Sequence, residues 1–245
     1  MTALGSLTRR SVLGTLRDGD LIFAIGGPVA FFVCFNITLR NVIDTGGMSY
    51  PQYILPVIVV QAMIFTAMTT ADRAARDHLS GMGIRMRSLP ITALAPVTAR
   101  MLSSLVRAVA ALAAALAIGY GFGFRLHGGF VELVAFVGIA LVLSLALSLG
   151  ADAMGSVARS TEAAGQVLLI PQLLLVMLST GIAPAQSFPS WLGPFVRNQP
   201  VSVIAETLRG LAVGEYVRIG ASLAWCAGLL VVFGAIALMA QRRPR

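Results

Sequence analysis

The stretch LVAFVGIALVLSLALSLGA, residues 133–151, carries no charged side chain. A transmembrane helix needs about 20 mostly apolar residues to cross about 30 Å of hydrocarbon, so this stretch has the length and composition of one span. Similar stretches recur along the chain, and the predicted spans cover residues 21–39, 53–71, 101–124, 133–151, 163–182 and 217–240. The sequence therefore predicts an all-α integral membrane protein with six transmembrane helices.

The overall composition leads to the same fold class. Only 11% of the 245 residues are charged and 57% are hydrophobic, with a mean hydropathy of +0.86. A soluble domain has about 25% charged residues, because its surface faces water. Six spans joined by short loops use nearly the whole chain. We therefore expect a single transmembrane domain over residues 1–245, with no separate soluble domain.

The distribution of charge predicts the orientation of the spans. The net charge of +8 comes from arginine alone, because the sequence contains no lysine. The arginines lie at the ends of apolar stretches and not in one patch with aromatic residues, which argues against a nucleic-acid partner. Most of them lie in residues 1–20, in residues 72–100 and after residue 240. Arginine is retained on the cytoplasmic side, where anionic lipid attracts it, so we expect a multi-pass protein of the plasma or inner membrane with both termini cytoplasmic.

The N-terminal segment, residues 1–20, allows two interpretations. The run from Thr8 to Leu13 resembles a twin-arginine export signal. In such a signal a short apolar region follows directly, whereas here Arg17, Asp18 and Asp20 interrupt the run. We therefore favour a short interfacial helix on the cytoplasmic leaflet.

The longest charged interval, residues 72–100, is expected to be a cytoplasmic amphipathic segment. On a helix, Leu79, Met82 and Met86 would share one apolar stripe. Gly81 and Gly83 lower helix propensity, so a break or bend is predicted near them. A segment held between two spans could transmit force from a partner protein. Packing on lipid headgroups alone is the alternative.

The interval before the last span, residues 183–216, is too polar to span the membrane and too apolar for a free loop. Its prolines predict two short helices, at residues 190–196 and 201–214, with a break at residues 198–200. Lipid offers no hydrogen bonds to an irregular backbone, so a re-entrant helical hairpin on the outer side is one solution. An amphipathic external loop resting on the bilayer is the alternative.

The residue types that carry common enzyme chemistry are scarce. A P-loop needs a lysine, so a sequence without lysine has no such ATP site, and two histidines form no metal motif. We therefore expect a chain that is not catalytic by itself and binds no metal. Arg107, inside the third span, is either paired within the protein or extends to the cytoplasmic interface; both interpretations stay open.

Two stretches together resemble a known family. The first is Asp77-x3-Gly81-x3-Arg85-x-Arg87-Ser88-Leu89-Pro90-Ile91, followed by Arg100. The second comprises Pro189-Ser190-Trp191-Leu192, Asn198-Gln199-Pro200-Val201, Arg209-Gly210-Leu211 and Gly214. They resemble the cytoplasmic segment and the outer re-entrant segment of type-2 ABC exporter permeases of the daunorubicin-resistance kind. The resemblance covers essentially the whole chain.

The resemblance implies a permease subunit of an ATP-driven exporter, with ATP and Mg²⁺ bound by a separate ATPase and no cofactor on this chain. Two ATPase copies would serve a homodimer or heterodimer of permeases. The residues implied in coupling to the ATPase are Arg76, Asp77, Gly81, Arg85, Arg87, Ser88, Leu89 and Pro90. Those implied in the outer segment are Pro184, Pro189, Trp191, Asn198, Pro200, Arg209, Gly210 and Gly214.

The cargo class follows less directly. Family members of this kind export drugs, lipids or polysaccharides, and no carboxylate lies centrally in a predicted span. Because proton-coupled carriers use such carboxylates, we expect an amphipathic drug-like or lipid-like cargo. The alternatives are a six-span secondary carrier or channel without an ATPase partner, or a membrane protein with an assembly role only.

Overall fold

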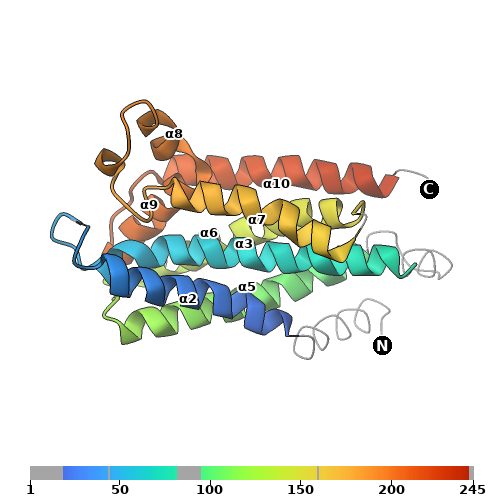
Figure 1. Ribbon diagram of the computed structural model, residues 1–245, viewed down its shortest axis with the longest axis horizontal. Coiled ribbons are helices and arrows are strands. Elements are labelled where there is room, and N and C mark those ends of the chain that lie inside the picture. The colour runs from blue at the N-terminus through green and yellow to red at the C-terminus, as the bar shows by residue number, and fades with distance from the viewer. Residues whose placement is uncertain (1–18, 44, 82–94, 159, 243–245) are drawn as a thin grey trace.

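The computed structural model describes residues 19–43, 45–81, 95–158 and 160–242. Within these ranges every regular element is a helix, and the long helices lie side by side along one axis (Figure 1). The long helices are α2 (Asp20–Leu39), α3 (Tyr50–Leu79), α5 (Ala95–Gly121), α6 (Phe130–Gly155), α7 (Thr161–Met177) and α10 (Ile219–Arg242). The short ones are η1 (Ala185–Ser187), α8 (Gly193–Asn198) and α9 (Pro200–Val213).

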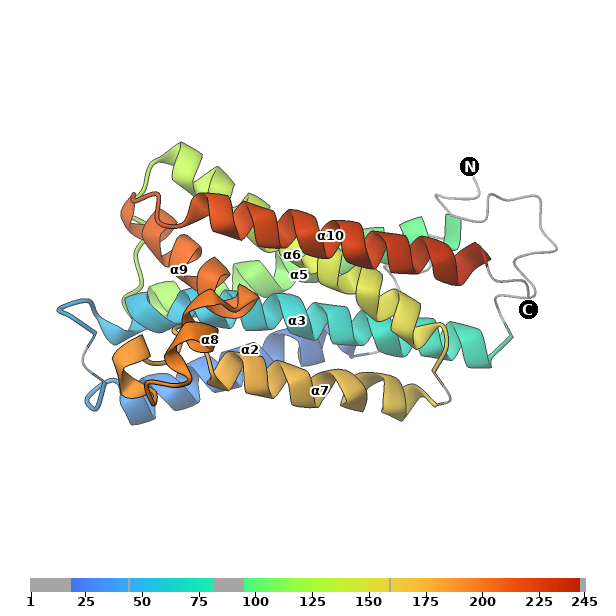
Figure 2. The same ribbon diagram turned by 90° about the horizontal axis from the view of Figure 1, so that it is seen from above.

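Helix α3 is the centre of the bundle. It contacts α2, α5, α6, α7 and α9, and its apolar part is buried on nearly all sides (Figure 2). The helix starts after Ser49, whose backbone is extended, and carries Pro51 in its first turn, where no intrahelical N–H bond is lost. It ends before Gly81, which adopts a φ of +67°, a conformation that favours glycine. The predicted break near Gly81 is therefore present.

Two predicted span boundaries lie six or more residues inside the helices. The predicted second span ends at residue 71, but α3 continues without a break to Leu79. The third predicted span starts at residue 101, whereas α5 starts at Ala95. Polar residues end an apolar stretch without ending a helix, so hydropathy places both boundaries too far inside the helices. Residues 72–79 and 95–100 of the expected coupling segment are thus extensions of α3 and α5.

The predicted span at residues 163–182 corresponds to α7, which has 17 residues and ends at Met177. The chain then turns at residues 178–182, where a Cβ at Gly181 would collide with the Val57 side chain. Among the described residues, five helices are long and apolar enough to cross a membrane, and α7 is a shorter apolar helix. The candidate spans are Leu21–Leu39, Tyr50–Leu79, Pro96–Gly121, Phe130–Gly155 and Ile219–Met239.

The two ends of the bundle differ in what they contain. At one end, here named the α9 end, lie the loop residues 40–43, 45–49 and 122–129 together with η1, α8 and α9 (Figure 1). At the opposite end, here named the Arg100 end, α3 and α6 finish and α5 and α7 begin (Figure 2).

Small and hydroxyl-bearing residues hold the long helices together. Thr66 of α3 and Ser144 of α6 share a hydrogen bond of 3.1 Å, and Ser104 of α5 and Ser148 of α6 share one of 2.5 Å. A Cβ at Gly155 would collide with the carbonyl oxygen of Ala71, so only glycine permits this approach of α6 to α3. Small residues and interhelical hydrogen bonds are the usual means by which membrane helices associate.

Candidate functional site

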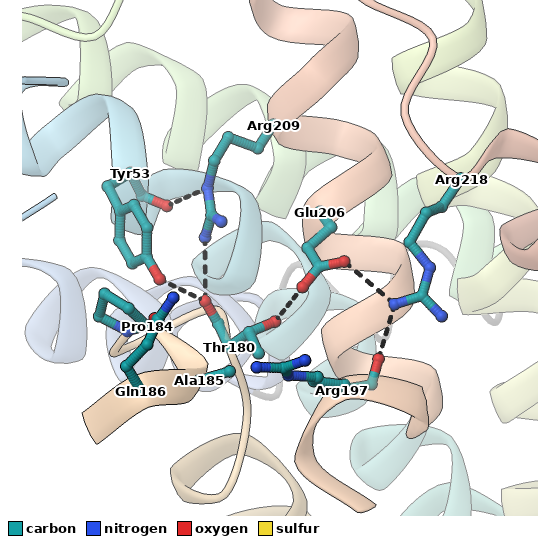
Figure 3. Close-up of a pocket in the computed structure, with 9 residues that line it drawn as sticks. All are labelled: Tyr53, Thr180, Pro184, Ala185, Gln186, Arg197, Glu206, Arg209 and Arg218. Atoms are coloured by element: carbon teal, nitrogen blue, oxygen red, sulfur yellow. Dashed lines mark hydrogen bonds and ion pairs between the residues drawn. The ribbon is translucent and has the colours of Figure 1, made fainter. Parts of the chain in front are cut away.

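A polar cavity of about 410 Å³ lies at the α9 end of the bundle (Figure 3). We name it the arginine cavity, because three arginines are among the residues that line it. These residues are Tyr53, Thr180, Pro184, Ala185, Gln186, Arg197, Glu206, Arg209 and Arg218. They come from α3, the turn after α7, η1, α8, α9 and the start of the α10 segment, so the cavity exists only when these segments pack together.

Arg209 of α9 contacts the central helix α3 and stabilises the packing of the two helices. Its guanidinium carbon lies 3.7 Å from the centroid of the Tyr53 ring, a cation–π contact. Its Nε donates to the Tyr53 carbonyl at 3.1 Å, and Nη2 donates to the Thr180 carbonyl at 3.3 Å. The Tyr53 hydroxyl donates to the same Thr180 carbonyl at 2.7 Å. Burial lowers the pKa of Arg209 from its ordinary value, but an arginine stays protonated in proteins.

Glu206, one turn before Arg209 on α9, has two partners in the cavity. Its Oε1 accepts a hydrogen bond from the Thr180 hydroxyl at 2.7 Å, and its Oε2 pairs with Arg218 at 3.2 Å. Arg218 also donates to the Arg197 carbonyl at 2.7 Å and to Asn198 Oδ1 at 3.0 Å. These bonds join α8, α9 and the segment before α10 into one unit.

The residues implied for the outer segment have different positions. Pro200 lies in the first turn of α9, and Gly214 ends that helix with a φ of +88°. Gly210 lies close to the Glu215 carbonyl, where a Cβ would come within 2.8 Å of the oxygen. Arg209 and Pro184 line the arginine cavity, and Asn198 binds one of its arginines. Trp191 and Pro189 are exposed and do not line the cavity.

The predicted helix pair in this segment is present with shifted bounds. The structure has α8 at Gly193–Asn198 and α9 at Pro200–Val213, separated at Gln199. Gln199 stabilises the break, because its amide nitrogen donates to the carbonyl oxygens of Leu175 and Leu178 at 2.9 and 2.5 Å. The first predicted helix starts too early because residues 189–192 form a turn, in which the Leu192 amide donates to the Pro189 carbonyl.

From the sequence alone, no role is predicted for the remaining lining residues. Five of these residues lie in five separate segments, namely α3 (Tyr53), the turn after α7 (Thr180), α8 (Arg197), α9 (Glu206) and the segment before α10 (Arg218). The density of arginine and glutamate between residues 197 and 218 is a local signal that could have indicated a polar site. No local signal connects that stretch to Tyr53, which is 156 residues away from Arg209.

At the opposite end of the bundle, Arg100 is paired with two carboxylates. We name Arg100, Asp152 and Asp77 the carboxylate cluster. Arg100 binds Asp152 of α6 through both Nε and Nη2, the latter at 3.2 Å, and its Nη1 lies 3.4 Å from Asp77 of α3. The Asp152 side chain is 5% exposed and the Asp77 side chain is 39% exposed. The cluster therefore joins α3, α5 and α6 through one buried pair and one partly exposed pair.

Arg107 lies further along α5 and is fully buried. Its Nη2 donates to the Thr70 hydroxyl at 2.8 Å and its Nη1 donates to the Ser103 hydroxyl at 2.9 Å. A guanidinium bonded within the protein does not extend to the aqueous interface. Of the two interpretations from the sequence, the one in which Arg107 is paired within the protein is therefore correct.

A second cavity, of about 460 Å³, opens between α2, α3 and α7 near the Arg100 end. We name it the α7 cavity. Its apolar lining comes from Phe23, Met68 and Leu169, and its polar lining includes Asp72 and Arg76. Arg76, one of the implied coupling residues, thus lines a cavity, and Asp77 belongs to the carboxylate cluster.

The other implied coupling residues are only partly described. Gly81 ends α3, as stated above. The remaining positions lie outside the described residues: Arg85, Arg87, Ser88, Leu89 and Pro90. In the part of the chain that the structure describes, no group of three or more His, Cys, Asp or Glu residues could hold a metal ion.

The fold and the two cavities define a multi-pass helical membrane protein with polar sites at both ends of its bundle. Comparison with known proteins identifies the class. Residues 2–213 match the family model described as ABC-2 type transporter. The chain therefore belongs to the ABC-2 type transporter family.

Three relatives are similar along most of their length. The doxorubicin resistance ABC transporter permease protein DrrB of Mycobacterium tuberculosis is 35% identical over 227 residues, which cover 89% of this chain and 78% of the relative. The probable doxorubicin resistance ABC transporter permease protein DrrC of the same organism is 29% identical, over 91% of this chain and 83% of the relative. The daunorubicin resistance ABC transporter permease protein DrrB1 of Streptomyces coeruleorubidus is 27% identical, over 91% and 80%.

Proposed function

We propose that this chain is the transmembrane permease of an ATP-driven exporter, with ATP and Mg²⁺ bound by a separate ATPase subunit. Membership of the ABC-2 type transporter family is the observation that carries this proposal, and the names of the relatives agree with it. The complex would contain two permeases, identical or similar, and two ATPase subunits. It would lie in the plasma or inner membrane with both termini of the permease in the cytoplasm.

The proposed topology has six spans, with α7 as the fifth. The α7 helix has 17 residues and is about 25 Å long, and the turn at residues 178–182 extends it toward the α9 end. In this topology the Arg100 end faces the cytoplasm, and α8 and α9 form an outer re-entrant pair. The burial of α9 against α3, α6 and α10 supports that arrangement, because a loop resting on the bilayer would leave α9 more exposed.

Helix α3 provides a physical route for coupling. Its 30 residues form one helix of about 45 Å that starts near Tyr53, in the arginine cavity, and ends at the segment proposed to contact the ATPase. The carboxylate cluster ties the end of α3 to α5 and α6. A displacement of this end would therefore be transmitted along α3 instead of being lost in a local bend.

The cargo is proposed to be amphipathic and drug-like or lipid-like. The α7 cavity supports this, because its lining combines apolar side chains with an aspartate and an arginine. An amphipathic molecule would place its apolar body against Phe23, Met68 and Leu169 and its polar group near Asp72 and Arg76. Doxorubicin, which appears in the names of two relatives, is a suitable first probe.

The test of the proposed function is reconstitution with and without the ATPase. The purified permease is expected to show no ATP hydrolysis, and inside-out vesicles are expected to accumulate doxorubicin only when the ATPase and ATP are both present. Robust ATP hydrolysis by the permease alone would contradict the proposal. Accumulation driven by a proton or sodium gradient without any ATPase would favour a secondary carrier.

The double substitution Arg85→Ala with Arg87→Ala tests the proposed coupling segment. Losing one charge-assisted contact typically costs about 1.5–3 kcal/mol, or roughly a 10- to 150-fold loss of affinity. We expect normal expression and insertion, loss of ATP-driven export, and weaker co-purification of the ATPase. Insertion should persist because the other cytoplasmic arginines still set the orientation. Export by the variant at the wild-type rate would show that these arginines contact lipid only and have no role in coupling.

A further inference from the structure

The lining of the arginine cavity carries more positive than negative charge. Arg197, Arg209 and Arg218 contribute three guanidinium groups, and Glu206 contributes the carboxylate. Glu206 is already engaged, because it accepts hydrogen bonds from Thr180 and Arg218. Of the described residues in this cavity, only Arg218 forms an ion pair with it. The described residues that line the cavity therefore do not balance its positive charge.

Two of the arginines retain donors for a ligand. In the part of the chain that the structure describes, no hydrogen bond or ion pair is made by the Arg197 guanidinium, whereas the Arg197 carbonyl is bound by Arg218. Figure 3 shows the Arg197 side chain reaching from α8 toward Ala185 and Thr180. Arg209 uses Nε and Nη2 for the carbonyls described above, and within the described ranges its Nη1 donors bind no other residue. The amide of Gln186 adds a neutral donor to the same lining.

The fixed positions of these arginines matter as much as their number. The stacking on Tyr53 holds the Arg209 guanidinium in one plane, and three bonds hold Arg218. A guanidinium that is already oriented loses less conformational entropy when it binds an oxyanion. Its paired N–H donors match the spacing of phosphate and carboxylate oxygens. A cavity of about 410 Å³ has the size of a small-molecule site.

We propose that the arginine cavity is a binding site for the phosphate group of a small molecule or a phospholipid. The Arg197 guanidinium would donate paired hydrogen bonds to the phosphate oxygens. Arg209 Nη1 would be a second cationic donor, and the Gln186 amide would donate a neutral hydrogen bond. Glu206 would remain bound to Arg218 and Thr180, so the entering anion would not displace it. The site does not depend on the proposed export function, because binding requires neither ATP nor the ATPase.

The test measures thermal unfolding of the full-length permease in two arms. In an uncharged detergent, inorganic phosphate is titrated against chloride at constant ionic strength. In mixed micelles of the same detergent, an uncharged galactolipid without a phosphate group is compared with phosphatidylglycerol. Ligand bound only to the folded state raises the unfolding temperature, so the titration gives an apparent affinity. A response to phosphate shows that the free anion suffices, and a response confined to phosphatidylglycerol assigns the site to a lipid headgroup; either supports the proposal.

The decisive variant is Arg197→Gln, with Arg40→Gln as the matched control. Among the described residues, the Arg197 side chain has no partner to lose, so the variant should unfold at the wild-type temperature when phosphate and anionic lipid are absent. Arg40 is also exposed and lies at the same end, after α2, but does not line the cavity. We expect Arg197→Gln to weaken the apparent affinity at least about tenfold and Arg40→Gln to leave it unchanged. Equal losses in both variants, or no anion-specific response of the wild type in either arm, would overturn the proposal.

Discussion

The two ends of this helix bundle use arginine in opposite ways. In the carboxylate cluster, one arginine faces two aspartates, and Asp152 binds Arg100 with both oxygens. In the arginine cavity, three arginines share one glutamate. The first arrangement neutralises the arginine within the protein and connects three long helices. The second leaves positive charge and donors exposed to a cavity.

The difference separates a structural contact from a binding site. A buried guanidinium needs a partner, because removing a charge from water costs several kcal/mol. Arg100 meets that need with carboxylates, and little is left for a ligand. The partners of the Arg209 guanidinium are carbonyl oxygens and an aromatic ring, which stabilise the cation without neutralising its charge. Three substitutions test this distinction, and their expected effects on stability decrease in the order given.

The substitution Asp152→Ala is expected to have the largest effect. It would leave the Arg100 guanidinium nearly buried without its main carboxylate, and breaking a buried pair in this way typically costs about 3–5 kcal/mol. We expect a strong fall in the thermal unfolding temperature of the purified chain and a lower yield in the membrane. A variant as stable as the wild type would show that Asp77 alone can neutralise Arg100.

Replacing Arg209 with alanine should have an intermediate effect. The variant loses the stacking on Tyr53 and two hydrogen bonds between α9 and its neighbours, for which we expect about 2–3 kcal/mol. Arg125→Ala is the matched control, because Arg125 lies over Tyr120 at 5.4 Å and donates to two carbonyls but is exposed. The thermal unfolding temperatures of the two variants are compared. An equal loss of stability in both would mean that burial does not strengthen the contacts of Arg209.

The smallest effect is expected for Asp77→Ala. The Asp77 side chain is 39% exposed and lies 3.4 Å from Arg100, so water and Asp152 both compensate for its loss. Partly exposed ion pairs typically contribute about 0–1 kcal/mol. Unfolding measured beside Asp152→Ala should therefore show a small shift. A loss as large as that of Asp152→Ala would show that the two aspartates act as one unit.

Much of the helical architecture can be predicted from the sequence, because the length of an apolar stretch is a local property. Helix α2 coincides with the predicted span 21–39 apart from its first residue. The breaks at Gly81 and near Pro200 are also local, since they follow from the backbone preferences of glycine and proline. The errors lie at helix ends, as in α3, where charged residues continue a helix whose apolar part has already ended.

The sites depend on the tertiary structure. Arg100 and Asp152 are 52 residues apart, and Arg209 and Tyr53 are 156 residues apart. A periodic pattern indicates which face of a helix is apolar, but not which helix packs against it or at what height. The sequence by itself thus determined a multi-span helical protein, its breaks and its arginine-rich segments. Only the packing of the helices decided that Arg107 is bonded inside the bundle. Packing also decided that Arg100 is neutralised at one end, whereas the arginines at the other end face a cavity. The reason is that such contacts depend on the distances between helices.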